Sequence, residues 1–256
     1  MQLVDTHTHL YLKDFENDID TVIQSAMDSG VQRFYLPAID SSELENMLHL
    51  EKRFPGVCIP MVGLHPCSVK ENFKDELSIV EEWLNKRKFV AIGEIGLDFY
   101  WDKTFTTQQY DAFNLQMEWA LQFKLPIVIH TRNAMQETID AVKPYAQKGL
   151  SGIFHCFGGS SEDAAAITAM GFYLGIGGVL TYKKSGLAEA LDHVSLNNIV
   201  LETDSPYLSP VPYRGKRNES SYIKIIAEKL ATVKNVSLEE VAAITTANAN
   251  RIFRFA

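Results

Sequence analysis

Two histidines separated by a single residue, His7 and His9, follow a short apolar run near the start of the chain. Side chains alternate between the two faces of an extended strand, so residues with this spacing point in the same direction. Two imidazoles on one face, at the end of a first strand, can bind one divalent metal. A lone His-x-His pair is more often accidental or structural, so its meaning depends on what the rest of the chain brings near it.

The remainder of the chain alternates apolar, β-branched runs with stretches of helical periodicity. The eight predicted strands are Leu3–Thr6, Arg33–Ala38, Cys58–Leu64, Phe89–Ile95, Ile127–Thr131, Gly152–His155, Phe172–Ile176 and Ile199–Glu202. Eight strand–helix repeats in 256 residues have the size and rhythm of a (β/α)8 barrel. A doubly wound open sheet usually needs fewer strands and a glycine-rich turn after its first strand, which is missing here. We therefore predict one α/β domain over residues 1–256, a TIM-type (β/α)8 barrel, with a proline-rich coil at Ser205–Asn218.

Composition narrows the class of protein. The formal net charge of −8 argues against a long nucleic-acid footprint held by general electrostatics, because such proteins are usually basic. Any phosphate binding must then come from a local basic cluster or from bound metal. No apolar run approaches the roughly 18 residues of a membrane span, and no secretory signal is visible. The three cysteines have no zinc-ribbon or disulfide-framework spacing, so we expect reduced thiols and a cytoplasmic protein.

Most predicted strands end in a side chain of a type that binds metals, at the end where barrel enzymes carry their functional residues. Taken singly, each histidine is better interpreted as a satisfied polar residue, and each carboxylate as an ion pair or the start of a turn. Five of the seven histidines nevertheless fall at these ends, and buried charge is costly unless it is paired or metal-bound. The residues at these strand ends are His7, His9, His65, Glu94, His130, His155 and Asp204, with Glu202 just before it, and four imidazoles and two carboxylates among them together predict a metal site.

Imidazoles and carboxylates without a thiolate favour Zn, Mn, Fe, Co or Mg over a structural cysteine-based zinc site. Four imidazoles with two carboxylates are too many ligands for one catalytic ion that keeps an open position. They suit two ions bridged by one carboxylate, and Glu94 is the natural bridge because its strand is central. Two ions about 3.5–4 Å apart would activate a water, whose proton Asp204 at the last strand could accept.

Seven motifs, in order along essentially the whole chain, resemble those of the TatD family of metal-dependent deoxyribonucleases, which are amidohydrolase-like barrels. They are Asp5-Thr6-His7-Thr8-His9, Gly63-Leu64-His65-Pro66, Gly93-Glu94-Ile95-Gly96-Leu97-Asp98-Phe99, Ile129-His130-Thr131-Arg132, His155-Cys156-Phe157-Gly158-Gly159, Glu202-Thr203-Asp204-Ser205-Pro206-Tyr207 and Arg214-Gly215-Lys216-Arg217-Asn218-Glu219. The resemblance implies a metal-dependent hydrolase fold and 3′→5′ exonuclease action on DNA, with two divalent ions (Mg, Mn or Zn). The metal ligands that it implies are His7, His9, Glu94, His130, His155 and Asp204. Ser220 departs from the family, which often has proline there.

Basic side chains in the proline-rich loop after the last strand are candidates for phosphate binding. Guanidinium and ammonium groups of Arg214, Lys216 and Arg217 can bind phosphate oxygens. Considered alone, this loop is better interpreted as solvated, but next to two metals the phosphate role is favoured. His65 could donate a hydrogen bond to a phosphate or leaving oxygen, or pack under Pro66, and we favour the phosphate role.

The loop after Glu94 contains the consecutive aromatic residues Phe99, Tyr100 and Trp101. Such rings could stack on a terminal base, a contact worth about 1–3 kcal/mol and indifferent to sequence. They could equally form the core of their own loop, and the sequence favours neither interpretation.

Three functions are compatible with these residues. The leading one is a phosphodiesterase acting on single-stranded 3′ ends of DNA, with Asp204, Glu94, His65 and Glu202 as catalytic candidates. The second is a hydrolase of an amide, ester or lactone, including an aminoacyl-tRNA ester, since fold does not determine substrate. The third is a catalytically silent binding barrel, which an intact ligand set argues against. We expect no membrane association, no obligate protein partner and a monomer.

Overall fold

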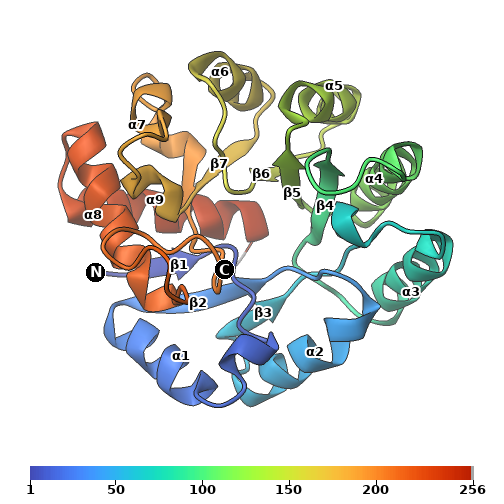
Figure 1. Ribbon diagram of the computed structural model, residues 1–256, viewed down its shortest axis with the longest axis horizontal. Coiled ribbons are helices and arrows are strands. Elements are labelled where there is room, and N and C mark those ends of the chain that lie inside the picture. Colours follow the sequence, from blue (N-terminus) through green and yellow to red (C-terminus); the bar gives the residue numbers. More distant parts are fainter. Residues whose placement is uncertain (255–256) are drawn as a thin grey trace.

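The computed structural model describes residues 1–254, and its strands form a parallel barrel surrounded by helices (Figure 1). The strands are β1 Leu3–Asp5, β2 Val31–Leu36, β3 Cys58–Pro60, β4 Ile92–Asp98, β5 Ile127–Arg132, β6 Gly152–Phe154, β7 Tyr173–Ile176 and β8 Ile199–Leu201. The helices are α1 Ile19–Asp28, α2 Leu44–Arg53, α3 Phe73–Lys86, α4 Thr106–Phe123, α5 Met135–Ala146, α6 Ser161–Ala169, α7 Leu187–Ala190, α8 Ile223–Lys234 and α9 Leu238–Phe253. The predicted (β/α)8 barrel is confirmed, with all eight predicted strands present in the predicted order.

The predicted single domain extends to residue 256, but residues 255 and 256 lie outside the described residues, so this boundary stays a prediction. Within residues 1–254, no helix has both the length and the apolarity needed to cross a membrane. The predicted coil at 205–218 contains neither helix nor strand.

Two seams join the strands into a ring. Continuous parallel pairing runs through β1-β2-β3 and through β4-β5-β6-β7-β8. Between β3 and β4, Val62 forms a parallel bridge with Ile92, and the Gly93 N–H donates to the Val62 carbonyl at 2.9 Å. Between β8 and β1, the Thr6 N–H donates to the Leu201 carbonyl at 3.1 Å. Each seam consists of backbone hydrogen bonds made by a residue just after the end of a strand, Val62 after β3 and Thr6 after β1. These bonds close the barrel.

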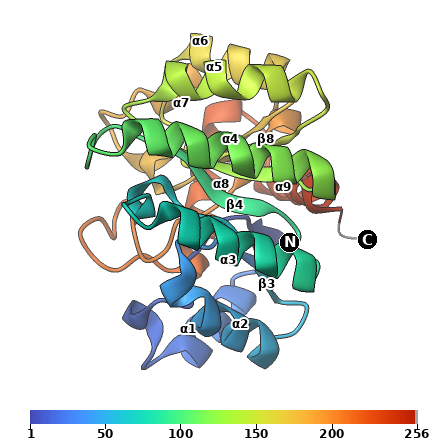
Figure 2. The same cartoon turned by 90° about the vertical axis from the view of Figure 1, so that its right-hand side faces the viewer.

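Helix α9 seals the amino-terminal end of the barrel. Inward-facing apolar side chains of the strands, Val4 and Tyr35 among them, pack against Ile252 and Phe253 of this helix. The Tyr35 and Phe253 rings are stacked, with their centroids 3.9 Å apart. Figure 2 shows both termini and α9 at one end and the orange loop after β8 at the opposite end. The closed end leaves the carboxyl ends of the strands as the mouth.

The position of β4 differs from the predicted Phe89–Ile95. It begins at Ile92, which pairs with Ile127, and continues to Asp98, which pairs with Arg132. Phe89 and Ala91 are buried and Val90 is partly buried, but none of them belongs to a strand; the Ala91 carbonyl accepts the Val62 N–H at 3.4 Å. At the other end, β5 continues far enough to extend the ladder to Asp98. Glu94 therefore lies within the strand, and Asp98 occupies its carboxyl end.

Glu94 is the irregular position of this strand. The register with β5 shifts between Gly93 and Ile95, so Glu94 has no partner there. Its N–H donates instead to the Ala38 carbonyl at 3.0 Å, across the β2 side of the barrel. Such a bulge re-aims a side chain and is common near active sites.

Two glutamines of α4, seven residues apart, hold the backbone at the mouth. Gln116 is fully buried; its Oε1 accepts the Leu64 N–H at 2.7 Å and its Nε2 donates to the Leu64 carbonyl at 3.3 Å. Gln109 makes the same pair of bonds with Asp98, at 2.9 and 3.1 Å. The two side-chain amides bond backbone groups that have no neighbouring strand to pair with. In this way they position Asp98 and, next to Leu64, His65.

We predict that Gln116→Ala lowers the free energy of unfolding by about 2–4 kcal/mol, because it leaves the buried N–H and carbonyl of Leu64 without partners. Urea unfolding followed by circular dichroism measures this change. Glu118→Ala, an exposed change on the same helix, is the control and should stay within about 0.5 kcal/mol of the parent. Equal effects of the two changes would contradict the proposed role of Gln116.

Candidate metal centre

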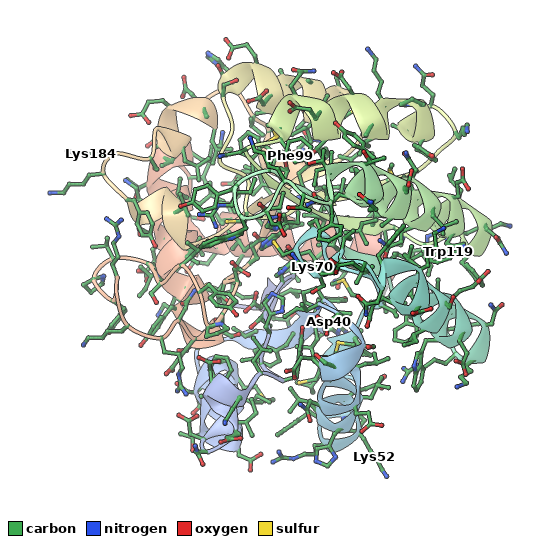
Figure 3. All side chains as sticks on the ribbon, turned by 45° about the vertical axis from the view of Figure 1, so that its right-hand side comes forward. Asp40, Lys52, Lys70, Phe99, Trp119 and Lys184 are labelled. Atoms are coloured by element: carbon green, nitrogen blue, oxygen red, sulfur yellow. The ribbon has the colours of Figure 1, made fainter. Side chains whose placement is uncertain are left out.

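Five histidines and two carboxylates from six strands meet at the carboxyl ends of the barrel. All of them except the fully buried His7 line a cavity of about 840 Å³, within the usual size range of ligand sites. Figure 3 shows side chains of three loops that follow strands, Asp40 after β2, Lys70 after β3 and Phe99 after β4, along the middle of the view. Lys52 and Trp119 lie on the outer helices in the same view. The residues that line the cavity itself come from distant parts of the sequence, from His9 after β1 to Leu208 after β8.

One oxygen of the Glu94 carboxylate faces the histidines of β1. Glu94 Oε2 lies 3.1 Å from His7 Nε2 and 3.7 Å from His9 Nε2. The two Nε2 atoms are 3.3 Å apart, and all three residues are buried. This half of the site is a compact three-residue group that could hold a metal ion.

The other oxygen faces the opposite wall. Glu94 Oε1 lies 2.9 Å from His130 Nδ1, 3.4 Å from His65 Nε2 and 3.9 Å from His155 Nε2. His65, Glu94 and His130 form a second group with metal-ligand spacing. Glu94 thus presents a separate oxygen to each half of the site, the geometry required of a bridging carboxylate.

Asp204 completes the first half from the end of β8. Its Oδ1 lies 3.5 Å from His9 Nε2 and 3.7 Å from both His7 Nε2 and His155 Nε2. Its backbone is in the left-handed region, with φ 58°, and its N–H donates to the His7 carbonyl. This local conformation points the carboxylate into the cluster.

Two of the histidines face a carboxylate with their outer nitrogens. His130 Nε2 is 2.8 Å from Asp98 Oδ2, and His155 Nδ1 is 2.9 Å from Glu202 Oε1. Metal-binding histidines usually have such a second partner, which sets the tautomer and the ring orientation. Gly175 leaves room for Glu202, because a Cβ at that position would lie 2.1 Å from its Oε2.

The tautomer of His9 follows from Tyr11. The Tyr11 hydroxyl donates to the Pro37 carbonyl at 2.6 Å, so it can only accept from His9 Nδ1, 2.9 Å away. The proton of a neutral His9 then sits on Nδ1, and the Nε2 lone pair points into the cluster. Lone pairs and carboxylates directed at one place, with no lysine or arginine among them, fit a divalent cation. The donor set therefore fits the metals that the sequence predicts.

Burial and the neighbouring charges act in opposite directions on the pKa values of the cluster. Burial raises the pKa of Glu94, but His7, His65 and His155 outweigh it and hold that pKa well below its usual range. Burial lowers the pKa of His155, whereas Glu202, Asp204 and Glu94 raise it, to a net value of about 10. Burial lowers the pKa of His7. Attraction between carboxylates and imidazoles therefore dominates the shifts at Glu94 and His155.

Sequence reasoning missed two supporting residues. Asp98 lies in the quoted Gly-Glu-Ile-Gly-Leu-Asp motif, and its position four residues after Glu94 was a usable signal. Tyr11 is two residues after His9, the same spacing that relates His7 to His9. Glu202, a catalytic candidate, lies behind His155, fully buried, where it also accepts the Cys156 N–H.

The four predicted phosphate-binding residues do not all lie near the metal-binding cluster. Arg217 is bound by the Asp18 carboxylate, at 2.6 and 2.9 Å, and by Glu219 at 3.0 Å, so it anchors the β8 loop to the start of α1. Arg214 lies 4.5 Å above the Tyr182 ring, and Lys216 is exposed. Of this set, only His65 lines the cavity. Arg132 lines it as well, although the sequence assigns it no phosphate-binding role.

The fold and this site define a metal-dependent hydrolase built on a parallel barrel. Residues 4–254 match the family described as TatD related DNase, and the chain belongs to that family.

Relatives of the chain extend over its whole length. It is 36% identical over 253 residues to a Bacillus subtilis (strain 168) protein called uncharacterized metal-dependent hydrolase YabD, covering 98% of this chain and 99% of the relative. It is 30% identical over 257 residues to the 3′-5′ ssDNA/RNA exonuclease TatD of Erwinia tasmaniensis, covering 98% and 99%. Among solved structures, the TatD homologue YjjV of Escherichia coli superimposes with a TM-score of 0.93 at 25% identity, covering 99% and 98%.

We predict that Glu94→Ala abolishes binding of both metals, because each half of the site loses its shared oxygen. Elemental analysis after dialysis against Mn2+ or Zn2+ measures the ions bound per chain. The outcome that contradicts the bridging geometry is two ions per chain in Glu94→Ala.

We predict that Asp98→Asn weakens metal binding about 10- to 100-fold, the usual effect of removing a partner of a metal-binding histidine. The introduced amide can donate a hydrogen bond to His130 Nε2, and the imidazole proton then moves to Nδ1. A protonated Nδ1 has no lone pair with which to bind a metal ion. Calorimetric titration of chelator-treated protein with Mn2+ measures the affinity. Asp102→Asn, an exchange in the neighbouring exposed loop, should leave it unchanged.

Proposed function

We propose that this protein is a 3′→5′ exodeoxyribonuclease that hydrolyses the terminal phosphodiester of single-stranded DNA. The observation that supports this most directly is Glu94, whose two oxygens face separate histidine groups at the floor of a cavity large enough for a nucleotide. Two-metal sites of this kind serve phosphodiester cleavage. The Erwinia relative that bears an exonuclease name is consistent with the same chemistry.

The site residues divide into metal-holding and proton-handling groups. His7, His9, Glu94, His130, His155 and Asp204 would hold the two ions. The bound ions would supply Lewis-acid activation of water and charge stabilisation at the phosphoryl oxygens. Within the described part of the chain no lysine lines the cavity, so Glu94 would take the position between the ions that a carbamylated lysine holds in many amide-cleaving barrels.

Two residues would move the protons of the hydrolysis. Burial raises the pKa of Asp204, but His155 and its neighbours lower it overall, so its carboxylate can accept the proton of the attacking water. His65 Nδ1 accepts the Cys67 N–H at 3.0 Å, which leaves its proton on Nε2, the atom that faces the cavity. That N–H lies 3.4 Å from Glu94 Oε1 and borders the cavity, where it would donate to a phosphate oxygen or to the departing 3′ oxygen of the shortened strand.

The test is a strand-degradation assay with a 5′-labelled single-stranded DNA oligomer and EDTA, Mg2+, Mn2+ or Zn2+. We expect a ladder that shortens from the 3′ end only when metal is added. Glu94→Ala, purified identically, is the control for contaminating nucleases and should be inactive. Absence of cleavage with every ion, in protein shown to contain metal, would contradict the proposed substrate.

A further inference from the structure

The exposed apolar side chains of this protein gather at the mouth of the site. Within residues 1–254, five of the seven exposed large hydrophobic residues belong to the loops after β4 and β8, namely Tyr100, Trp101, Tyr207, Leu208 and Val211. Trp101 is the most exposed of all seven, at 67%, and still lines the cavity. Exposed apolar surface concentrated at one place marks an interaction site.

Hydrogen bonds hold the backbone of the aromatic part of this rim. Asp98 Oδ1 accepts the N–H of Tyr100 at 2.9 Å and that of Trp101 at 3.1 Å, while its other oxygen pairs with His130. Lys70 binds Asp102 at 2.9 Å and ties the end of the loop to the segment after β3. A fixed aromatic surface loses little conformational entropy on binding a ligand.

The three aromatic residues of this loop have different roles. Phe99 is packed against the core and lies 6.1 Å from the Tyr110 ring, so it is not available to a ligand. The Tyr100 and Trp101 rings are 4.9 Å apart and perpendicular, at 85°. The structure therefore separates the stacking candidates into one core residue and two rim residues.

Arg132 adds a positive charge to the same surface. Its guanidinium lies 3.8 Å from the Tyr100 ring centre and 5.0 Å from that of Trp101. Among the residues that the structure describes, no carboxylate lies within ion-pair distance of it. A stacked guanidinium keeps its edge donors free, and these match phosphate oxygens bidentately.

We propose that Tyr100, Trp101 and Arg132 form a platform that stacks the unpaired base at the 3′ end of a strand and binds its backbone phosphate. The inference rests on the proposed exonuclease function and explains how that site selects its substrate. A base can offer its face to the platform only when it is not stacked in a duplex, and this makes single strands the preferred substrate. Stacking on aromatic rings is tolerant of sequence, as an exonuclease requires.

The first test compares two oligomers that differ only in their 3′-terminal residue, a normal thymidine or an abasic sugar. Loss of the base should lower kcat/KM of the parent about 5- to 150-fold, the usual value of one stacked base. Trp101→Ala should cause a similar loss on the normal end and almost none on the abasic end, because one contact cannot be lost twice. Trp101→Phe should restore much of the activity. The proposal is overturned if Trp101→Ala lowers kcat/KM by the same factor on the abasic end as on the normal end.

The second test does not depend on hydrolysis. The Trp83→Phe/Trp119→Phe protein retains Trp101 as its only tryptophan, and both replacements lie on outer helices. Metal-loaded protein is titrated with oligothymidine that has phosphorothioate 3′ linkages, and with its fully abasic counterpart. Quenching of Trp101 fluorescence by the first and not the second supports the platform, even if no DNA is cleaved and the exonuclease function fails. Equal quenching by the two oligomers, or no quenching by either, overturns the platform. The exposed apolar rim would then be assigned to a protein partner instead.

Discussion

A buried carboxylate between two groups of histidines is the constraint on which this site depends. Charge inside a protein is costly unless it is paired, and Glu94 is paired on both of its oxygens. Those pairings require four different strands to place imidazole nitrogens within 4 Å of one side chain. Only a closed barrel brings the ends of so many strands to one point, so the fold and the site require each other.

Polar support extends outward from that centre. Asp98, Glu202 and Tyr11 orient the imidazoles, while Gln109 and Gln116 hold the backbone from α4. At the β8–β1 seam, buried Asp5 accepts the Thr203 N–H at 2.9 Å and its hydroxyl at 2.6 Å. Burial raises the pKa of Asp5 to about 7. The mouth is therefore built from polar groups that hold one another, although buried atoms such as His7 Nδ1 and Glu202 Oε2 have no hydrogen-bond partner among the described residues. The opposite end of the barrel is apolar and plugged by α9.

Strand order and ligand chemistry could be predicted because both are local properties of the sequence. Apolar runs of strand length identify the eight strands, and a histidine or carboxylate at their ends identifies the donor types. The predicted start of β4 was wrong because Phe89 and Ala91 are buried outside any strand, and its predicted end was wrong because pairing with β5 continues to Asp98. Arg217 shows a second limit: its sequence neighbourhood fits a phosphate-binding loop, but Asp18, almost 200 residues away in the chain, binds its guanidinium.

By itself the sequence determined the barrel, the order of its strands and the kinds of atoms that meet at its mouth. Tertiary structure alone decided which oxygen of Glu94 faces which histidine, which nitrogens are held from behind, and which basic residues are already paired. It also decided that Phe99 is core while Trp101 is rim. The physical reason is that periodicity records which face of an element is buried, whereas pairing depends on distances between elements that only barrel closure brings together.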